Sequence, residues 1–99
     1  MSYEVLTAME VTDAEAYGKY REAMRPILES YGGGFRYDFW IKETLQTDAK
    51  HPVNRVFAIY FKDKASREAF FANPEYLEIR RKYFEPSVKA RTVIAEYER

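Results

Sequence analysis

Cysteine is absent from the 99-residue sequence. This absence excludes disulfide scaffolds, iron–sulfur clusters, cysteine-ligated zinc and thiol nucleophiles as classes. Histidine occurs once, as His51, so a transition-metal site with its usual nitrogen and sulfur ligands would instead need several carboxylates. We therefore predict that the protein binds neither a metal ion nor another cofactor.

Neither charge sign is in excess, because 16 lysines and arginines balance 16 aspartates and glutamates. Affinity for phosphate backbones comes largely from clustered cations, so a nucleic-acid partner is not expected. No apolar run approaches the roughly 18 residues that a membrane-spanning helix needs, and the N-terminus has no basic region followed by an apolar segment. We expect a cytoplasmic protein that does not enter a membrane.

Glycine and proline are scarce as well, with four residues of each. Together with a 46% share of hydrophobic residues, this excludes a disordered tail, a collagen-like repeat and a low-complexity linker. The length suits one domain over residues 1–99 with one modest core.

The first third of the chain predicts a strand followed by a helix. Residues 3–11 alternate as a strand does, with Tyr3, Val5, Met9 and Val11 on one face. Thr12 to Glu15 form a capping box with Thr12 as the cap, and an apolar stripe at helical spacing follows: Tyr17, Tyr20, Met24, Ile27, Leu28 and Tyr31.

Two features then shape and end this helix. Pro26 lies inside it, and because the apolar stripe continues in phase, we expect a kink near Met24 and Arg25 rather than a break. Gly32 to Gly34 end the helix, the first glycine suiting a left-handed conformation.

The remaining residues predict two strands, a helical region and a final strand. Residues 35–43 and 55–61 alternate, and a polar loop from Gln46 to Asn54 joins them. Asp63 can cap a helix, Asn73–Pro74 restart it, and it continues to Pro86. Val88 to Tyr97 form the last strand. The order β-α-β-β-α-β predicts an α+β, ferredoxin-like fold, an antiparallel four-stranded sheet with two helices on one face.

The pattern also predicts what each sheet face carries. In the second strand, Phe35, Tyr37, Phe39 and Ile41 are expected to face the helices. The opposite face is then expected to carry these residues: Leu6, Ala8, Trp40, Val56, Ala58, Tyr60 and Ile94. Such an apolar exposed face is larger than a monomer normally tolerates, so we predict a homodimer formed through it.

The strongest candidates for a site lie on and beside the second strand. Arg36, Asp38 and Trp40 are expected to share one strand face, with Tyr60 on the neighbouring strand, and could line a pocket for a small apolar or aromatic molecule. Asp38 would be the general base and Arg36 would stabilise a developing anion. The alternative is a structural Arg36–Asp38 pair at the dimer interface, with Trp40 as an anchor.

Two further residues complete the candidate set. Tyr17 is either a core residue or a proton donor in a helix–sheet cleft. His51 is the one side chain whose ordinary pKa is near neutrality, so it is a candidate binding residue, although its polar loop also suits a solvated histidine.

Several stretches resemble the domain-of-unknown-function 1330 proteins of the dimeric α/β-barrel group. They are Glu10–Tyr17, Tyr31–Gly33 and Phe71–Tyr76, and with the element order the resemblance covers nearly the whole chain. It implies a homodimer whose two sheets face each other, and it implies no established activity. Relatives of the same architecture include cofactor-free monooxygenases of antibiotic biosynthesis and small isomerases.

Two function classes follow. The first is a cofactor-free enzyme, an oxygenase or isomerase, acting on a small apolar or aromatic compound. The second is a non-catalytic dimer in which the same residues bind a small ligand or only hold the interface. The sequence contains no strong catalytic constellation that decides between them.

Overall fold

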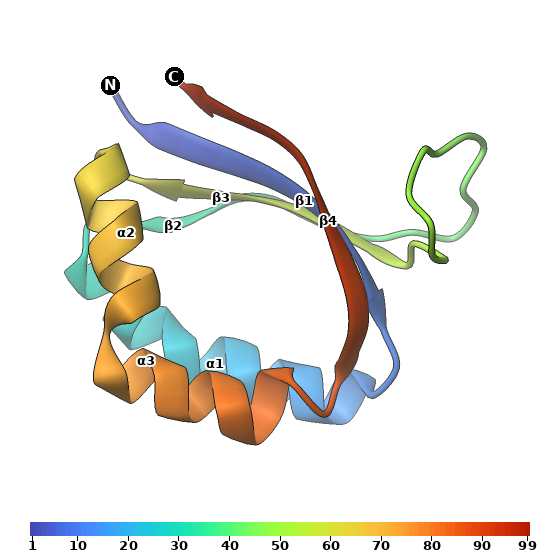
Figure 1. Cartoon of the computed structure of the whole chain (residues 1–99), viewed down its shortest axis with the longest axis horizontal. Coiled ribbons are helices and arrows are strands. Elements are labelled where there is room, and N and C mark those ends of the chain that lie inside the picture. The colour runs from blue at the N-terminus through green and yellow to red at the C-terminus, as the bar shows by residue number, and fades with distance from the viewer.

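A curved antiparallel sheet and a layer of helices on one of its faces make up the fold (Figure 1). The computed structural model describes residues 1–99. In chain order the elements are β1 (Tyr3–Val11), α1 (Ala14–Ser30), β2 (Gly34–Trp40), β3 (Arg55–Phe61), α2 (Lys64–Ala72), α3 (Pro74–Ile79), the π-helical turn η1 (Arg80–Phe84) and β4 (Val88–Glu98). The strand order is β2-β3-β1-β4, and every pairing is antiparallel. The predicted α+β, ferredoxin-like arrangement is confirmed.

Helix α1 begins one residue later than its sequence pattern indicates. Its cap is Asp13, whose carboxylate accepts a hydrogen bond from the Ala16 N–H at 3.0 Å. The prediction of Thr12 as the cap is wrong, because the Thr12 hydroxyl donates instead to the Ser87 carbonyl. The helix then runs without a break through Pro26, as predicted.

The end of α1 depends on two glycines with different tasks. Gly32 adopts φ +74°, the left-handed conformation expected of it. At Gly33 a side chain would collide with the Leu28 side chain and the Tyr60 carbonyl, because a Cβ there would lie 2.6 and 2.7 Å from their atoms. The close approach of α1 to β3 therefore requires glycine.

Two capping residues divide the second helical region into separate helices. Asp63 accepts from the Ser66 N–H at 2.7 Å to begin α2, and Asn73 accepts from the Tyr76 N–H at 3.0 Å to begin α3, with Pro74 in its first turn. Both caps were predicted from sequence. The wide turn η1 was not predicted.

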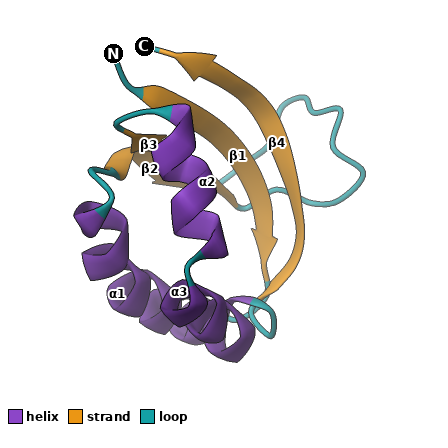
Figure 2. Ribbon diagram, turned by 60° about the vertical axis from the view of Figure 1, so that its left-hand side comes forward, coloured by secondary structure: helices purple, strands orange, loops and turns teal.

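The core lies between the sheet and the helices, and the turned view in Figure 2 shows the helices gathered on one side of the sheet. Val5, Met9 and Val11 of β1 face it, as the alternation predicts. Aromatic rings dominate the packing, with the Phe70 and Tyr76 ring centroids 4.3 Å apart. Each fully buried side chain of this size contributes on the order of 2 to 3 kcal/mol relative to exposure.

Strand β2 departs from the predicted alternation. Phe35 pairs with Ile59, but Tyr37 pairs with Ala58, so the register shifts by one residue at Arg36. This β-bulge places Arg36 and Tyr37 on the same face and reverses the phase of every later residue in the strand.

The bulge overturns two of the predicted faces. Tyr37 and Phe39 lie on the face away from the helices, where they are 51% and 52% exposed. Asp38 and Trp40 instead lie on the helix side, where Asp38 contacts Arg21 of α1. The predictions that Arg36, Asp38 and Trp40 share one face, and that Trp40 belongs to the outer face, are therefore wrong.

The connection between β2 and β3 extends from the end of the sheet that is opposite the chain termini (Figure 1). The Asn54 side chain holds it to β1, accepting from the Val11 N–H and donating to the Val11 carbonyl, both at 2.8 Å. His51 joins it to β4 through a hydrogen bond of 2.8 Å between its Nε2 and the Thr92 hydroxyl.

None of the helices combines the length and the apolar character needed to span a bilayer.

Candidate functional site

A cavity of about 500 Å³ lies between the helix-facing side of the sheet and the helices. Of its 20 lining residues 14 are hydrophobic, so its wall is mainly apolar. Val5, Thr7 and Met9 of β1 form part of its floor. Its size and lining are those of a small-molecule site.

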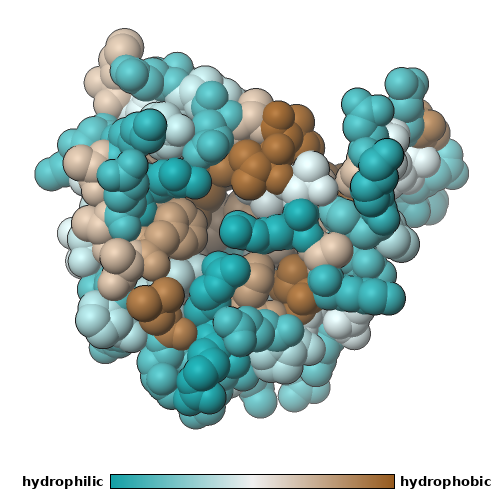
Figure 3. Space-filling model, in the orientation of Figure 1, coloured by the Kyte–Doolittle hydropathy of each residue, from teal (hydrophilic) through white to brown (hydrophobic).

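The cavity opens between β4 and the pair α2 and α3, three elements that are labelled in Figure 1. Val93 of β4 and Leu77 of α3 line it and are 41% and 46% exposed, which places the opening there. In the space-filling view of Figure 3, apolar residues are exposed in the middle of this side of the molecule, beside strongly polar ones.

Arg21 of α1 is the most buried charged group in the cavity wall, with 6% of its surface exposed. It falls on the buried side of α1 and stacks on Phe35, its guanidinium carbon 3.8 Å from the ring centre. Its Nε donates to the Tyr17 hydroxyl at 2.7 Å, and its Nη1 donates to Asp38 Oδ2 at 2.9 Å.

Asp38 lies behind Arg21 and is shared with a second guanidinium. Arg55 donates to both carboxylate oxygens at 2.8 Å, and its guanidinium carbon lies 4.2 Å from the centre of the Trp40 ring. Burial by itself would raise the pKa of Asp38, but the hydrogen bonds and charges of Arg55 and Arg21 outweigh burial and lower it. A carboxylate held in this way is a weak base, and its main effect is to fix Arg21.

Tyrosine hydroxyls supply the other polar groups in the cavity wall. Burial raises the pKa of Tyr17, even with Arg21 and Arg55 nearby, so its phenol stays protonated. Tyr20 and Tyr76 share a hydrogen bond of 2.8 Å, and Arg80 donates to the Tyr76 hydroxyl at 3.3 Å. Burial, followed by the neighbouring Tyr76, raises the pKa of Tyr20 well above 10.0. One O–H of the Tyr20–Tyr76 pair is used in the bond between them, so Tyr17 and the other member of the pair each keep a hydrogen that a bound molecule could accept.

The structure separates the residues predicted as a site. Tyr17 alone lines the cavity. Asp38 contacts it through Arg21, and Trp40 stacks on Arg55 at the edge of the sheet. Arg36 and Tyr60 lie on the opposite face of the sheet, where the Arg36 guanidinium carbon is 4.3 Å from the Tyr60 ring centre.

His51 does not line the cavity either: its ring bonds the Thr92 hydroxyl and, through Nδ1, the Pro52 carbonyl at 2.7 Å. The structure therefore does not bring the predicted set together.

The charged residues of the cavity wall that were not predicted from the sequence are mainly arginines. Arg21 had a signal, because it lies four residues after Tyr17 and three before Met24, on the apolar side of the helix. Arg67, Arg80 and Arg91 also line the cavity, from α2, η1 and β4. No local spacing connects these three positions, which only the fold brings together.

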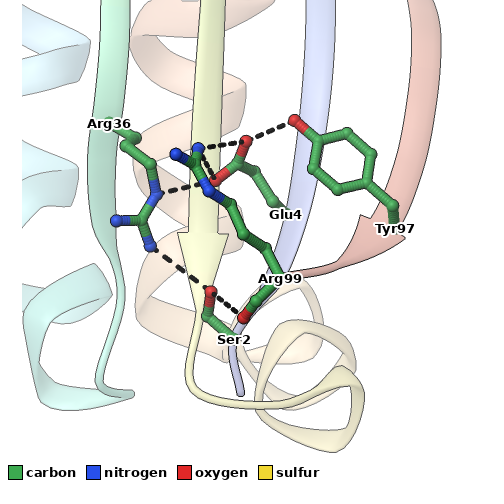
Figure 4. A network of polar contacts seen from close by, with 5 residues as sticks. All are labelled: Ser2, Glu4, Arg36, Tyr97 and Arg99. Atoms are coloured by element: carbon green, nitrogen blue, oxygen red, sulfur yellow. Dashed lines mark hydrogen bonds and ion pairs between the residues drawn. The ribbon is translucent and has the colours of Figure 1, made fainter.

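A second polar cluster lies on the opposite face of the sheet, near the chain termini, with side chains from β1, β2 and β4 and from both termini (Figure 4). Glu4 is 1% exposed at its centre. Arg36 donates to Glu4 at 2.7 Å, the Tyr97 hydroxyl donates to its other oxygen, and Arg99 donates to both at 3.4 Å. Burial would raise the pKa of Glu4, but these hydrogen bonds and positive charges lower it.

Because the Glu4 carboxylate is fully engaged, this cluster acts as a structural clasp between the ends of β1, β2 and β4. No three histidine, cysteine or acidic side chains gather closely enough to hold a metal ion anywhere in the chain.

Comparisons with known proteins agree with this architecture. The sequence model of the family described as "Domain of unknown function (DUF1330)" matches residues 2–98. A comparison with curated proteins finds no match to this chain. Among solved structures, a protein of unknown function from Rhodopseudomonas palustris superposes with a TM-score of 0.83 at 18% identity, covering 99% of this chain and 82% of the other.

Two more solved structures share the fold at lower similarity. A candidate antibiotic biosynthesis monooxygenase from Nitrosomonas europaea has a TM-score of 0.57 at 17% identity, covering 99% of this chain and 89% of the other. A dimeric protein of unknown function with a ferredoxin-like fold, from Bacteroides fragilis, has a TM-score of 0.53 at 14% identity, covering 99% and 96%. At these identities the likeness shows the fold alone.

Proposed function

The chain belongs to the DUF1330 family, a family of unknown function, and from that premise we propose that it binds a small, largely apolar molecule in the cavity between sheet and helices. The observation that carries this proposal is the cavity of about 500 Å³ with a mainly apolar wall. The buried Arg21 and the hydroxyls of Tyr17 and Tyr76 would orient the ligand, because each carries polar hydrogens in an apolar setting.

The reaction class that suits this wall is a cofactor-free one, an oxygenase or isomerase acting on a small apolar or aromatic compound. A charge that develops on a substrate oxygen would be stabilised by Arg21 and by a tyrosine hydroxyl. Asp38 would position Arg21 in this scheme. A base role for Asp38 requires it to leave at least one of its two arginines. The roles predicted for Arg36, Trp40, Tyr60 and His51 stay predictions.

Non-catalytic binding is the second candidate, and one observation favours it. Glu68 is the single carboxylate that lines the cavity, and it lies at the exposed opening. The wall therefore offers donors for binding a ligand and little base for abstracting its protons.

Blocking the cavity is expected to abolish ligand binding. Ala72 ends α2, lines the cavity and is exposed, so Ala72→Trp places a large side chain at the opening without displacing the core. We expect the dissociation constant of the neutral fluorescent probe N-phenyl-1-naphthylamine to rise at least about tenfold, which is a change of about 1.4 kcal/mol. Fluorescence titration measures it.

The matched control is Ala65→Trp. Ala65 is exposed on the same helix but does not line the cavity. It should leave the dissociation constant unchanged. Equal binding to both variants would place the probe elsewhere and reject the proposed site.

We also propose that two copies associate through the sheet face opposite the helices. Tyr37, Phe39 and Ile94 are each more than half exposed, and the rings of Tyr37 and Phe39 stack with centroids 6.1 Å apart. The small residues Ala8 and Ala58 lie on the same face and would allow close approach of a second sheet. A twofold pairing would cover this apolar surface, and the Bacteroides fragilis neighbour is described as dimeric.

Native mass spectrometry should show twice the chain mass of 11.8 kDa. Phe39→Glu is expected to weaken the dimer by about 30-fold, because a carboxylate would be buried without a partner at the interface. Leu77→Glu changes an equally exposed apolar residue on the helix side and should leave the mass doubled. A monomer in the unsubstituted protein would refute the dimer and leave the cavity proposal in place.

A further inference from the structure

The charges around the cavity are unequal, although the whole chain has a formal net charge of zero. Five charged residues line the cavity, four arginines and Glu68. The arginines are Arg21, Arg67, Arg80 and Arg91. Of these, Arg80 and Arg91 form no ion pair, since the carboxylates of the chain pair with other residues or with none.

The ion-paired arginines beside the cavity also leave a net positive charge. Asp38 neutralises one guanidinium but is shared by two, Arg21 and Arg55, whose side chains are only 8% and 12% exposed. Because water screens these groups poorly, their field extends into an apolar space. The cavity is therefore an electropositive space with an apolar wall.

Arg67 has a donor with no partner. Its Nη2 pairs with Glu96 of β4 at 2.9 Å, but its Nε is buried and makes no hydrogen bond, the one such side-chain atom in the chain. A buried donor that is left unsatisfied destabilises the protein. An acceptor on a bound molecule would satisfy it.

Arg80 offers a second uncommitted guanidinium. It is half-buried, with its guanidinium carbon 4.4 Å from the Phe84 ring centre, and its one hydrogen bond is with the Tyr76 hydroxyl. A solvated surface arginine would extend into water, whereas this one lies against the aromatic wall of the cavity. Guanidinium groups bind oxyanions with paired, charge-assisted hydrogen bonds.

We propose that the ligand of this cavity is an amphipathic organic anion, with an apolar, ring-sized body inside the cavity and one acidic group bound by Arg67, Arg80 and Arg91. The inference rests on the proposed function and specifies the ligand class. It also explains why arginines from α2, η1 and β4 converge on an otherwise apolar wall.

Two fluorescent probes that share one body test this inference. N-phenyl-1-naphthylamine is neutral, and 1-anilinonaphthalene-8-sulfonate is the same body with an acidic group. We expect the sulfonate to bind about tenfold more tightly, as one charge-assisted hydrogen bond would give. Arg80→Gln and Arg91→Gln should each reduce this preference about threefold to fivefold, measured as the ratio of the two dissociation constants within the same variant. Added salt should weaken binding of the sulfonate alone.

Arg25→Gln is the matched control, because Arg25 is an exposed arginine of α1 that forms no ion pair and does not line the cavity. It should leave both constants unchanged. The exposed Arg91 side chain makes no hydrogen bond or ion pair in the protein, so Arg91→Gln removes no contact that stabilises the fold. A loss of sulfonate binding in this variant therefore reports on the ligand and not on unfolding.

Different results would contradict the cavity proposal and the anion inference. Equal affinity for both probes, or a preference that persists in Arg80→Gln and Arg91→Gln, would overturn the anion inference while the cavity still binds the neutral probe. Binding of either probe that survives Ala72→Trp would reject the cavity as the site and the anion inference with it.

Discussion

Asp38→Asn is expected to lower the free energy of unfolding by about 3 kcal/mol, the low end of the range for breaking a buried ion pair from one side, because the Asp38 side chain is itself 31% exposed. Here two guanidiniums would be left, Arg21 and Arg55, with little access to water. Asparagine keeps the shape of the side chain but replaces an acceptor with an NH₂ donor that faces an arginine. Urea denaturation followed by circular dichroism measures the change.

Asp48→Asn is the control, an aspartate in the exposed connection between β2 and β3 that forms no ion pair. It should change the stability by less than about 0.5 kcal/mol. The double variant Asp38→Asn/Arg55→Gln should recover part of the loss, because one of the two unpaired charges is removed. A loss no larger than that of Asp48→Asn would mean that Arg21 is held by its aromatic neighbours rather than by Asp38.

Much of the fold could be predicted because its signals are local. The alternation of β1 and β3, the apolar stripe of α1, the caps Asp63 and Asn73, and the left-handed Gly32 each depend on a few neighbouring residues. Together they order the elements, and connections that are short everywhere except between β2 and β3 leave few ways to arrange four strands and the helices that cover them.

The face of β2 could not be predicted in the same way. Residues Phe35 to Trp40 follow an alternating pattern that is equally typical of a regular strand. The pattern therefore does not reveal that Arg36 is an extra, bulged residue. Long-range pairing selects the bulged form. With it, Arg36 can contact Glu4 on one face while Asp38 contacts Arg21 on the other. Both contacts join residues far apart in the sequence.

The site was harder to predict than the fold for the same reason. Its charged groups come from α1, α2, η1 and β4, and their positions in sequence have no common period. Sequence reasoning instead selected residues that are neighbours on one strand. Arg21 could have been identified from the sequence, because a charged residue on the buried side of a helix needs a partner. In the structure that partner is Asp38.

The charge pattern of the cavity also bears on the choice between catalysis and binding. Its wall holds donors and cations, Arg21, Arg80 and the tyrosine hydroxyls, which stabilise an anion whether it is a bound ligand or a reaction intermediate. A turnover that depends on proton abstraction would need a base from the ligand itself or from Asp38 released from its arginines. The comparison of the acidic and neutral probes should therefore be made before any search for catalysis, because its result identifies the class of compounds to test as substrates.

Glu4→Gln is expected to lower the free energy of unfolding by about 2 kcal/mol at neutral pH. The carboxylate is buried, but the side chains of its partners Arg36 and Arg99 are 34% and 49% exposed and can turn to water. The loss should therefore be smaller than for Asp38→Asn. Loss of the carboxylate would break the contacts drawn in Figure 4 that link Arg36, Tyr97 and Arg99 to Glu4. Glu98→Gln, an exposed neighbour without an ion pair, should have almost no effect.

Acid should abolish the difference between the Glu4→Gln variant and the unsubstituted protein. The pKa of Glu4 is lowered from its ordinary value of 4.5 in the folded state, so the unfolded chain binds a proton first as pH falls. The stability due to Glu4 is complete above pH 4.5 and disappears as pH drops through the lowered, folded-state pKa. Urea midpoints measured from pH 7 to pH 2 should converge for the two proteins, whereas a constant gap would mean that shape and not charge holds the clasp.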